Sequence, residues 1–137
     1  MYKCKYFKAH ELVEPQVYQE QGEGAFALFD EHNLRCLDSL RQRWGSSLII
    51  NNYGFGGHRK YSGLRSEDCP TGAPKSKHKK GIAFDLTCNR IKTLQSWIKQ
   101  NDSTLWIQRV ENFEHTPNWA HIEFSTEIVE ETYYFNP

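Results

Sequence analysis

Several features that mark well-known protein classes are missing from this chain. Its 17 basic and 17 acidic residues cancel, so no overall charge draws it to nucleic acid. No apolar run approaches the length that spans a bilayer, and no apolar segment follows the opening residues as it would in a secretory signal. There is no internal repeat and no low-complexity segment. We therefore expect neither a nucleic-acid binder nor a membrane protein, and we expect synthesis in a cytoplasm.

Two common motifs are missing as well. The four cysteines, Cys4, Cys36, Cys69 and Cys88, form no C-x-x-C pair, so free thiols are expected in a reducing compartment. Cys69 and Cys88 flank the site described below, and either remains open as an extra metal ligand. The glycines of residues 54–63 are not followed by G-K-S/T, which excludes a phosphate-binding loop.

The composition that is present indicates a packed globule. Apolar residues make up 38% of the 137 residues and aromatic residues 14%, enough to build a core of ordinary size. A chain of this length corresponds to one domain. We therefore treat residues 1–137 as a single domain.

The hydrophobic pattern predicts an α+β fold. A helix is expected from Asp30, a suitable N-cap, to about Trp44, with Gly45 as its stop. The other expected elements are a helix at about 89–100, short strands at about 47–52, 81–87, 105–110 and 119–124, an irregular stretch at 1–27 and a long loop at 53–80. These elements predict a small antiparallel sheet with two main helices packed on it. The aromatic tail 132–137 is expected to pack against the domain or to touch a partner.

The most informative pattern is the run S-K-H-K-K-G-I-A-F-D at residues 76–85, followed by W-A-H at 119–121. It offers His78, Asp85 and His121, and two imidazoles with one carboxylate are ligand types that leave a zinc ion an open position. His78 and Asp85 flank the entry to one expected strand, and His121 lies on another. The pattern therefore predicts a metal site on the sheet.

Alternation along the first of these strands supports that interpretation. Apolar residues at 82, 84 and 86 share one face, which places Asp85 on the opposite face with small neighbours. Glu123 follows His121 by two positions, so it should point to the same side and can orient the histidine. Taken singly, His78 fits a loop histidine and Asp85 a surface acid; the joint pattern favours a metal site.

These motifs resemble those of the zinc peptidases that cut bacterial cell-wall peptides. That family holds D-alanyl-D-alanine carboxypeptidases and phage L-alanyl-D-glutamate endopeptidases. Residues 6–12 and 62–66 are also similar to its opening segment and its arginine-bearing loop. The resemblance implies three zinc ligands, His78, Asp85 and His121. It also implies that Arg65 and Ser76 hold a carboxylate or carbonyl of the substrate.

One position departs from the family pattern. Several relatives carry an acidic general base three residues before the last zinc histidine, where this chain has Asn118. An amide cannot take up a proton at neutral pH. Glu114 and His115, seven and six residues before His121, are the remaining candidates for the catalytic base. The alternative is that both are turn residues that face solvent.

The resulting prediction is a zinc metallopeptidase that cleaves the stem peptide of peptidoglycan, as an endolysin or another phage or prophage protein of lysis or entry. Such a protein would reach the wall by lysis or by carriage in a virion, with other virion proteins as further partners. The alternative is a catalytically inactive zinc-binding module of the same fold, which binds cell wall or builds the virion. The lysines of residues 75–80 are consistent with a solvated loop or with attraction to an anionic polymer. Their use in nucleic-acid binding is disfavoured by the neutral net charge.

Overall fold

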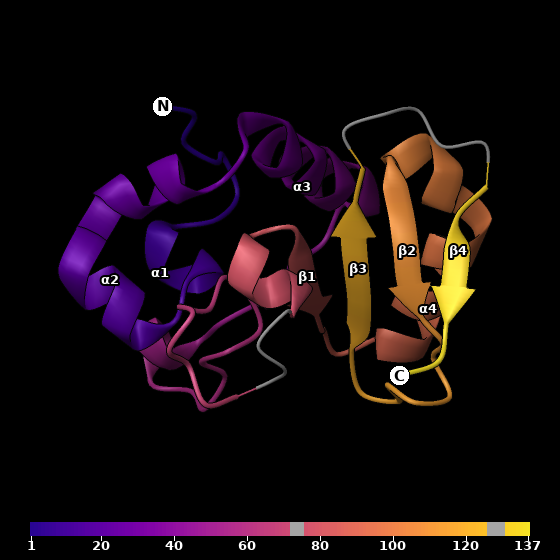
Figure 1. Ribbon diagram of the computed structural model, residues 1–137. Coiled ribbons are helices and arrows are strands. Elements are labelled where there is room, and N and C mark those ends of the chain that lie inside the picture. Colours follow the sequence, from indigo (N-terminus) through magenta and orange to yellow (C-terminus); the bar gives the residue numbers. More distant parts are fainter. Residues whose placement is uncertain (72–75, 126–130) are drawn as a thin grey trace.

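The computed structural model describes residues 1–71, 76–125 and 131–137 (Figure 1). Its α-helices are α1 (Ala9–Leu12), α2 (Pro15–Gln21), α3 (Glu31–Trp44) and α4 (Ile91–Asn101), and its strands are β1 (Ala83–Leu86), β2 (Ile107–Glu111), β3 (Ala120–Phe124) and β4 (Tyr133–Phe135). Short 3₁₀ helices lie at Gly22–Leu28, Tyr53–Phe55, Lys77–Lys80 and Asp102–Leu105. The predicted α+β class is confirmed.

The four strands form one sheet in the order β1-β3-β2-β4. β3 pairs antiparallel with both β1 and β2, as expected. The expected small antiparallel sheet is extended by β4, which pairs parallel with β2 and makes the sheet mixed. This edge strand comes from the aromatic tail, whose aromatic residues suit a strand. It covers an edge of β2 that would otherwise be unpaired.

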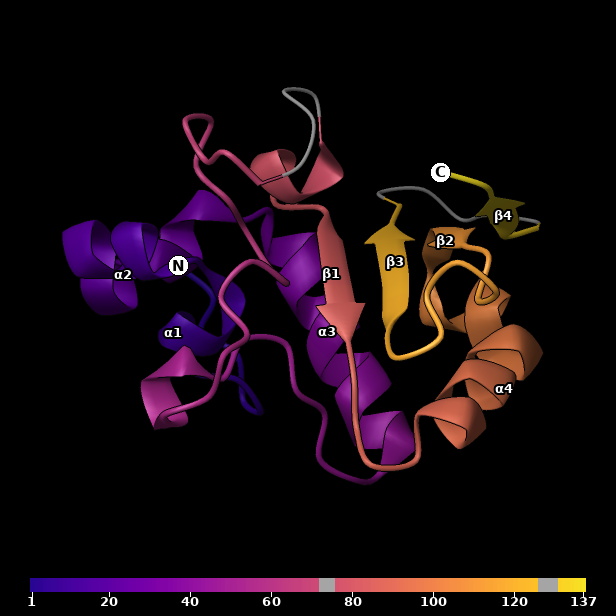
Figure 2. The same ribbon diagram turned by 90° about the horizontal axis from the view of Figure 1, so that it is seen from below.

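Helices α3 and α4 pack against the sheet, with the N-terminal helices on its β1 side (Figures 1 and 2). The core combines their apolar faces with one face of the strands. Its central side chains are Leu34, Leu37 and Leu40 of α3, Leu94 and Ile98 of α4, Phe84 and Leu86 of β1, Ile107 and Val110 of β2, and Ala120, Ile122 and Phe124 of β3. Because side chains alternate along a strand, Asp85 and His121 are left on the opposite face of the sheet. Arg109 joins them because the register of β2 shifts between Ile107 and Arg109, so that Ile107 and Val110 both enter the core.

Helix α3 has the ends that its sequence predicts. The Asp30 side chain accepts a hydrogen bond from the backbone N–H of His32, and Gly45 closes the helix in the left-handed region at φ 80°. By contrast, the expected strand at 47–52 is reduced to a single bridge between Ile49 and Thr87. Leu48 and Ile50 in this segment are buried, but the segment forms no continuous ladder with a neighbouring strand. Apolar residues favour burial, and burial alone does not require strand pairing.

The prediction that residues 1–27 are irregular is wrong. Pro15 does not break a helix but begins one, because the first helical position needs no N–H donor and suits the fixed φ of proline. Gly22 then ends α2, and a 3₁₀ helix follows. These short helices are held by burial of side chains such as Leu12 and Phe26.

The long loop predicted at 53–80 is present, apart from two 3₁₀ turns, within its described residues. Its residues 61–66 run between the N-terminal helices and β1. On one side the Leu64 N–H donates to the Leu12 carbonyl at 2.7 Å, and on the other the Asp85 N–H donates to the Ser62 carbonyl at 2.8 Å. The loop is therefore fixed by backbone hydrogen bonds where it passes the predicted metal ligands.

No helix in the described part of the chain is both long and apolar enough to cross a membrane.

Candidate metal centre

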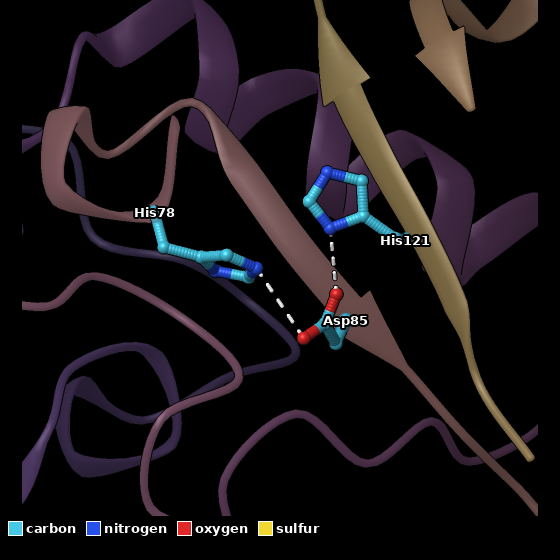
Figure 3. Close-up of side chains that lie close together, drawn as sticks. All are labelled: His78, Asp85 and His121. Carbon is cyan, nitrogen blue, oxygen red and sulfur yellow. Dashed lines mark hydrogen bonds and ion pairs between the residues drawn. The ribbon is translucent and has the colours of Figure 1, made fainter. Parts of the chain in front are cut away.

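The three residues predicted to bind metal lie together (Figure 3). They lie on the side of the sheet that does not face the hydrophobic core. Asp85 on β1 and His121 on β3 are direct partners in the antiparallel register, and His78 comes from the 3₁₀ turn that precedes β1. One ligand atom from each residue lies within 4.8 Å of the other two. The site is buried or nearly so, since His78 is 3% exposed.

The Asp85 carboxylate lies between the two imidazoles. Its Oδ1 is 2.9 Å from Nδ1 of His121, and its Oδ2 is 3.3 Å from Nε2 of His78. The histidine rings meet edge to face, with centroids 5.1 Å apart. Each residue thus directs a nitrogen or oxygen toward a common point.

The second nitrogen of each ring has an acceptor of its own. Nδ1 of His78 lies 3.0 Å from the Gly63 carbonyl, and Nε2 of His121 lies 3.0 Å from Oε2 of Glu123. Carbonyl and carboxylate oxygens only accept, so these two nitrogens carry hydrogen. The remaining nitrogen of each ring faces the Asp85 carboxylate, and it is the nitrogen whose lone pair a bound metal ion would take. Outer partners of this type fix the tautomer of metal-binding histidines.

Charge in the metal-free cluster follows from the same contacts. Burial alone would raise the pKa of Asp85, but hydrogen bonds from His121 and His78 outweigh it and hold the pKa below its usual range. Burial alone would lower the pKa of His121, but Asp85 and Glu123 raise it to about 9. Without metal at neutral pH, His121 is a cation between two carboxylates. A metal ion would replace the proton on its Nδ1.

The local sequence explains how His78 is held. Ser76 is the N-cap of the 3₁₀ turn Lys77–Lys80, and its Oγ accepts a hydrogen bond from the His78 N–H at 3.3 Å. Gly81 ends the turn at φ 71°, a conformation that favours glycine and redirects the chain into β1. The S-x-H-x-x-G spacing therefore builds the turn itself. Ser76 is predicted to contact substrate, and in the structure its hydroxyl accepts this hydrogen bond from the backbone of the candidate ligand His78.

Outside the ligands, a chain of contacts crosses the sheet. Glu123 is 3% exposed and accepts a hydrogen bond from Nη1 of Arg109 at 3.2 Å. The Arg109 guanidinium lies 4.3 Å from the ring centre of Phe135 on β4. Sequence reasoning singled out Glu123 but missed Arg109 and Phe135. Alternation could not have located them, because the register of β2 shifts between Ile107 and Arg109 and the aromatic residues of the tail are consecutive.

Arg65 lies beside the cluster, as the resemblance implies. It is 9% exposed, its backbone N–H donates to the His78 carbonyl at 3.1 Å, and its Nε donates to the Tyr61 carbonyl at 2.7 Å. Burial lowers the pKa of the guanidinium, and the Asp85 charge opposes that change. Within the described residues its two terminal nitrogens have no hydrogen-bond partner, so they are available to a ligand.

Glu114 and His115, the predicted catalytic bases, are not brought into the cluster. They occupy the turn between β2 and β3 and contact each other, with Nε2 of His115 3.6 Å from a Glu114 oxygen. The Glu114 side chain is 75% exposed. Within the described ranges neither forms a hydrogen bond or ion pair with His78, Asp85 or His121. Asn118 is exposed, and its carbonyl accepts a hydrogen bond from Thr87.

Other candidates also fall outside the site. Cys69 and Cys88 are free thiols and are not members of the cluster as far as the described chain extends. A cavity of about 530 Å³ lies around Tyr6, Arg41 and Asn52, and none of the three candidate ligands lines it. In the lysine run of 75–80, Lys75 lies outside the described residues.

Comparisons of the chain with protein-family models, curated proteins and solved structures found no match. The resemblance to cell-wall zinc peptidases therefore stays a prediction from the motifs. The geometry of His78, Asp85 and His121 could hold a metal ion, and this finding does not depend on the resemblance.

Proposed function

We propose that the protein is a zinc-dependent peptidase that cleaves the stem peptide of bacterial peptidoglycan during phage or prophage lysis or entry. One observation carries the proposal: two histidines, each held by an acceptor on its outer nitrogen, and one aspartate converge on a single point. The motifs that supply these residues, S-x-H-x-x-G-x-A-x-D and W-x-H, are those that resemble the cell-wall peptidases.

The donor set fits zinc. Three protein ligands of nitrogen and oxygen type are the usual complement of a catalytic zinc site, which keeps one position open. In the metal-free cluster the Asp85 and Glu123 carboxylates are balanced by a proton on His121 and by Arg109, and a metal ion would take the place of that proton. Other divalent ions accept the same ligands, so the metal in the cell depends on availability as well as on geometry.

Each nearby residue has a task in peptide hydrolysis. A bound zinc ion supplies a Lewis acid that polarises a carbonyl and activates water. The Gly63 carbonyl holds the ring of His78 in its orientation, and the Glu123 carboxylate does the same for His121. Arg65 offers the free end of its guanidinium to a substrate carboxylate, and its burial strengthens that contact because little water competes.

Peptide hydrolysis also needs a residue that takes a proton from the attacking water and passes it to the leaving amine. Glu114 and His115 lie on an exposed turn and would have to approach the cluster when substrate binds. Their position, together with Asn118, favours a second candidate function. In it the same metal site belongs to a catalytically inactive module that binds cell wall or builds a virion.

One experiment separates the two candidates. Purified peptidoglycan fragments are incubated with zinc-loaded protein and analysed by mass spectrometry, with a chelator control and with Asp85→Asn. The exposed His58, which is not part of the cluster, supplies the matched control His58→Ala. The peptidase predicts a new stem-peptide product that the chelator and Asp85→Asn abolish and His58→Ala preserves. Metal-loaded, folded protein that yields no product from several wall chemistries would contradict it and support the inactive module.

A further inference from the structure

The cavity of about 530 Å³ beside α1 and α3 is separate from the metal site but connected to it. Asn51 lines the cavity, and its Oδ1 accepts a hydrogen bond from the Ser62 N–H at 2.9 Å. The Ser62 carbonyl in turn accepts the N–H of Asp85 at 2.8 Å. Two hydrogen bonds therefore lead from the cavity wall to a candidate metal ligand. The volume falls in the range of ~300–1,000 Å³ that is usual for small-molecule sites.

Two exposed aromatic side chains border this cavity. Tyr6 is 39% exposed and Phe55 is 64% exposed. Phe55 is nevertheless held in place, because its ring packs edge to face on the ring of His10, with centroids 5.0 Å apart. An exposed ring that is already fixed offers apolar area to a ligand at little cost in side-chain entropy.

Polar atoms with free bonding capacity belong to the same lining. The Arg41 guanidinium lies 4.9 Å from the ring centre of Tyr6 and forms no hydrogen bond or ion pair within the described residues. Oε2 of Glu11 accepts a hydrogen bond from the Lys8 N–H, whereas Oε1 has no partner in the described chain. Neither the free Glu11 oxygen nor the guanidinium is buried. Both are therefore open to solvent and to a ligand.

The loop that closes the cavity is fixed around Asn52. The Asn52 N–H donates to the Arg59 carbonyl, and its Oδ1 accepts the Arg59 N–H at 2.8 Å. Its carbonyl accepts the N–H of Gly57, where an added Cβ would collide with the Asn52 side chain. The loop is thus ordered before a ligand arrives, which reduces the entropy lost on binding.

The charges of the lining select the class of ligand. An anionic ligand would meet the like charge of Glu11, and a cationic ligand would meet that of Arg41. A guanidinium only donates hydrogen bonds and a carboxylate only accepts them, while a hydroxyl does both. A neutral ligand with several hydroxyls and one apolar face can therefore use both side chains and cover an aromatic ring. A sugar ring has this combination.

We propose that this cavity binds a neutral sugar, with its apolar face on Phe55 and its hydroxyls on Arg41 and Glu11. That the sugar belongs to the glycan strand that carries the cleaved stem peptide rests on the proposed function. Binding of the free sugar does not.

The test uses the whole, metal-free protein in NMR titrations that follow backbone amide shifts. Diacetylchitobiose is a neutral disaccharide, chitobiose is its cationic form without the acetyl groups, and AMP is anionic with a planar ring. Diacetylchitobiose should bind and shift the amides of Asn52, Phe55 and Gly57. Chitobiose and AMP should bind more weakly.

Phe55→Ala tests the aromatic wall. It should weaken binding of diacetylchitobiose about tenfold or more, because the ligand loses the apolar area that it covers. Phe55 is outside the core, so the variant should keep its fold, which the amide spectrum itself reports. Tyr133→Ala removes another aromatic ring that is 61% exposed, on β4, and should bind like the wild type.

Arg41→Gln tests the polar wall. It should also weaken binding about tenfold, as expected for the loss of a hydrogen bond from a charged donor. The matched control is Arg35→Gln on the same helix, where the guanidinium likewise lies over a tyrosine, 4.4 Å from the ring centre of Tyr2. Arg35 does not line the cavity, so this variant should bind like the wild type.

Insoluble peptidoglycan tests the source of the sugar. Metal-free wild type and Tyr133→Ala should co-sediment with it, and Phe55→Ala should do so less. Equal co-sedimentation of Phe55→Ala and the wild type would show that the wall glycan is not the ligand.

Three results would overturn the sugar site itself. They are wild-type protein that does not bind diacetylchitobiose, chitobiose or AMP that binds more tightly, and binding that survives both Phe55→Ala and Arg41→Gln. No metal and no turnover enter these measurements. Failure here therefore leaves the peptidase proposal untouched, and failure to cleave peptidoglycan leaves the sugar site untouched.

Discussion

At the scale of single residues, Asp85 is the centre of the candidate site. It contacts both histidines, and its carboxylate is the only candidate ligand that contributes a negative charge. Asp85→Asn keeps the shape of the side chain but removes that charge. We expect it to abolish stoichiometric zinc binding, measured by isothermal titration calorimetry with His58→Ala as the control that retains it. Wild-type affinity in Asp85→Asn would remove Asp85 from the ligand set.

Glu123 tests whether the outer contacts matter. It is expected to orient His121 through the bond to Nε2, and loss of such a partner typically lowers metal affinity about 10–100-fold. Glu123→Gln should therefore bind zinc more weakly by about that factor. Glu111→Gln, on the neighbouring strand β2, should leave the affinity unchanged. Equal affinities in the two variants would show that Glu123 only fills space.

The pKa of His121 predicts how the metal-free protein responds to pH. Its value rises from about 6.5 in the unfolded chain to about 9 in the folded protein. Between these values the folded state binds more protons than the unfolded state, so the free energy of unfolding falls as pH increases. Urea unfolding at pH 6.5 and pH 9 should show this loss in metal-free wild type.

The same measurement on His121→Gln provides the control. That variant lacks the titrating group, so its free energy of unfolding should change less over the same pH interval. A wild type whose stability is constant, or increases, between pH 6.5 and pH 9 would contradict the assignment of a protonated His121.

At the scale of elements, the segment 61–66 does more than connect its neighbours. The Gly63 carbonyl fixes the tautomer of His78, and the Ser62 carbonyl receives the N–H of Asp85. Loops that position ligands must themselves be held, and this one is held by backbone bonds to the Leu12 and Glu14 region. Metal binding should therefore depend on how closely this segment approaches α1.

Gly63→Ala tests that dependence. A Cβ at this position would collide with the backbone carbonyl of Leu12, which no rotamer change can move. We expect a loss of about 1–3 kcal/mol in the free energy of unfolding and weaker zinc binding. Gly24→Ala is the matched control, because nothing lies within 4 Å of its added Cβ. Unaltered stability and zinc affinity in Gly63→Ala would show that the segment adapts freely.

At the scale of the whole molecule, the parts that the sequence predicted were those set by local pattern. The caps of α3 and the alternation around Asp85 follow from short-range rules. The pairing of β1 with β3, which brings Asp85 and His121 together, is a long-range contact that was expected from the metal-ligand pattern alone. The N-terminal helices were missed because their stability comes from burial against the rest of the fold rather than from their own pattern. The parallel β4 depends on which edge of the sheet is free, and short-range pattern carries no such information.

The candidate site divides in the same way. The three ligands were grouped by the residue types of the sequence pattern, and the register of β1 and β3 places Asp85 directly opposite His121. The positions of Glu114 and His115 depend on how a turn projects from the sheet, which spacing does not determine.

The most direct test of the central claim is native mass spectrometry of the purified protein with zinc added. We predict one zinc ion per chain in the wild type and in His58→Ala, and none in His78→Ala, Asp85→Asn or His121→Ala, with folding of every variant checked by circular dichroism. Folded wild-type protein that binds no zinc, or folded ligand variants that retain it, would contradict a metal centre at His78, Asp85 and His121.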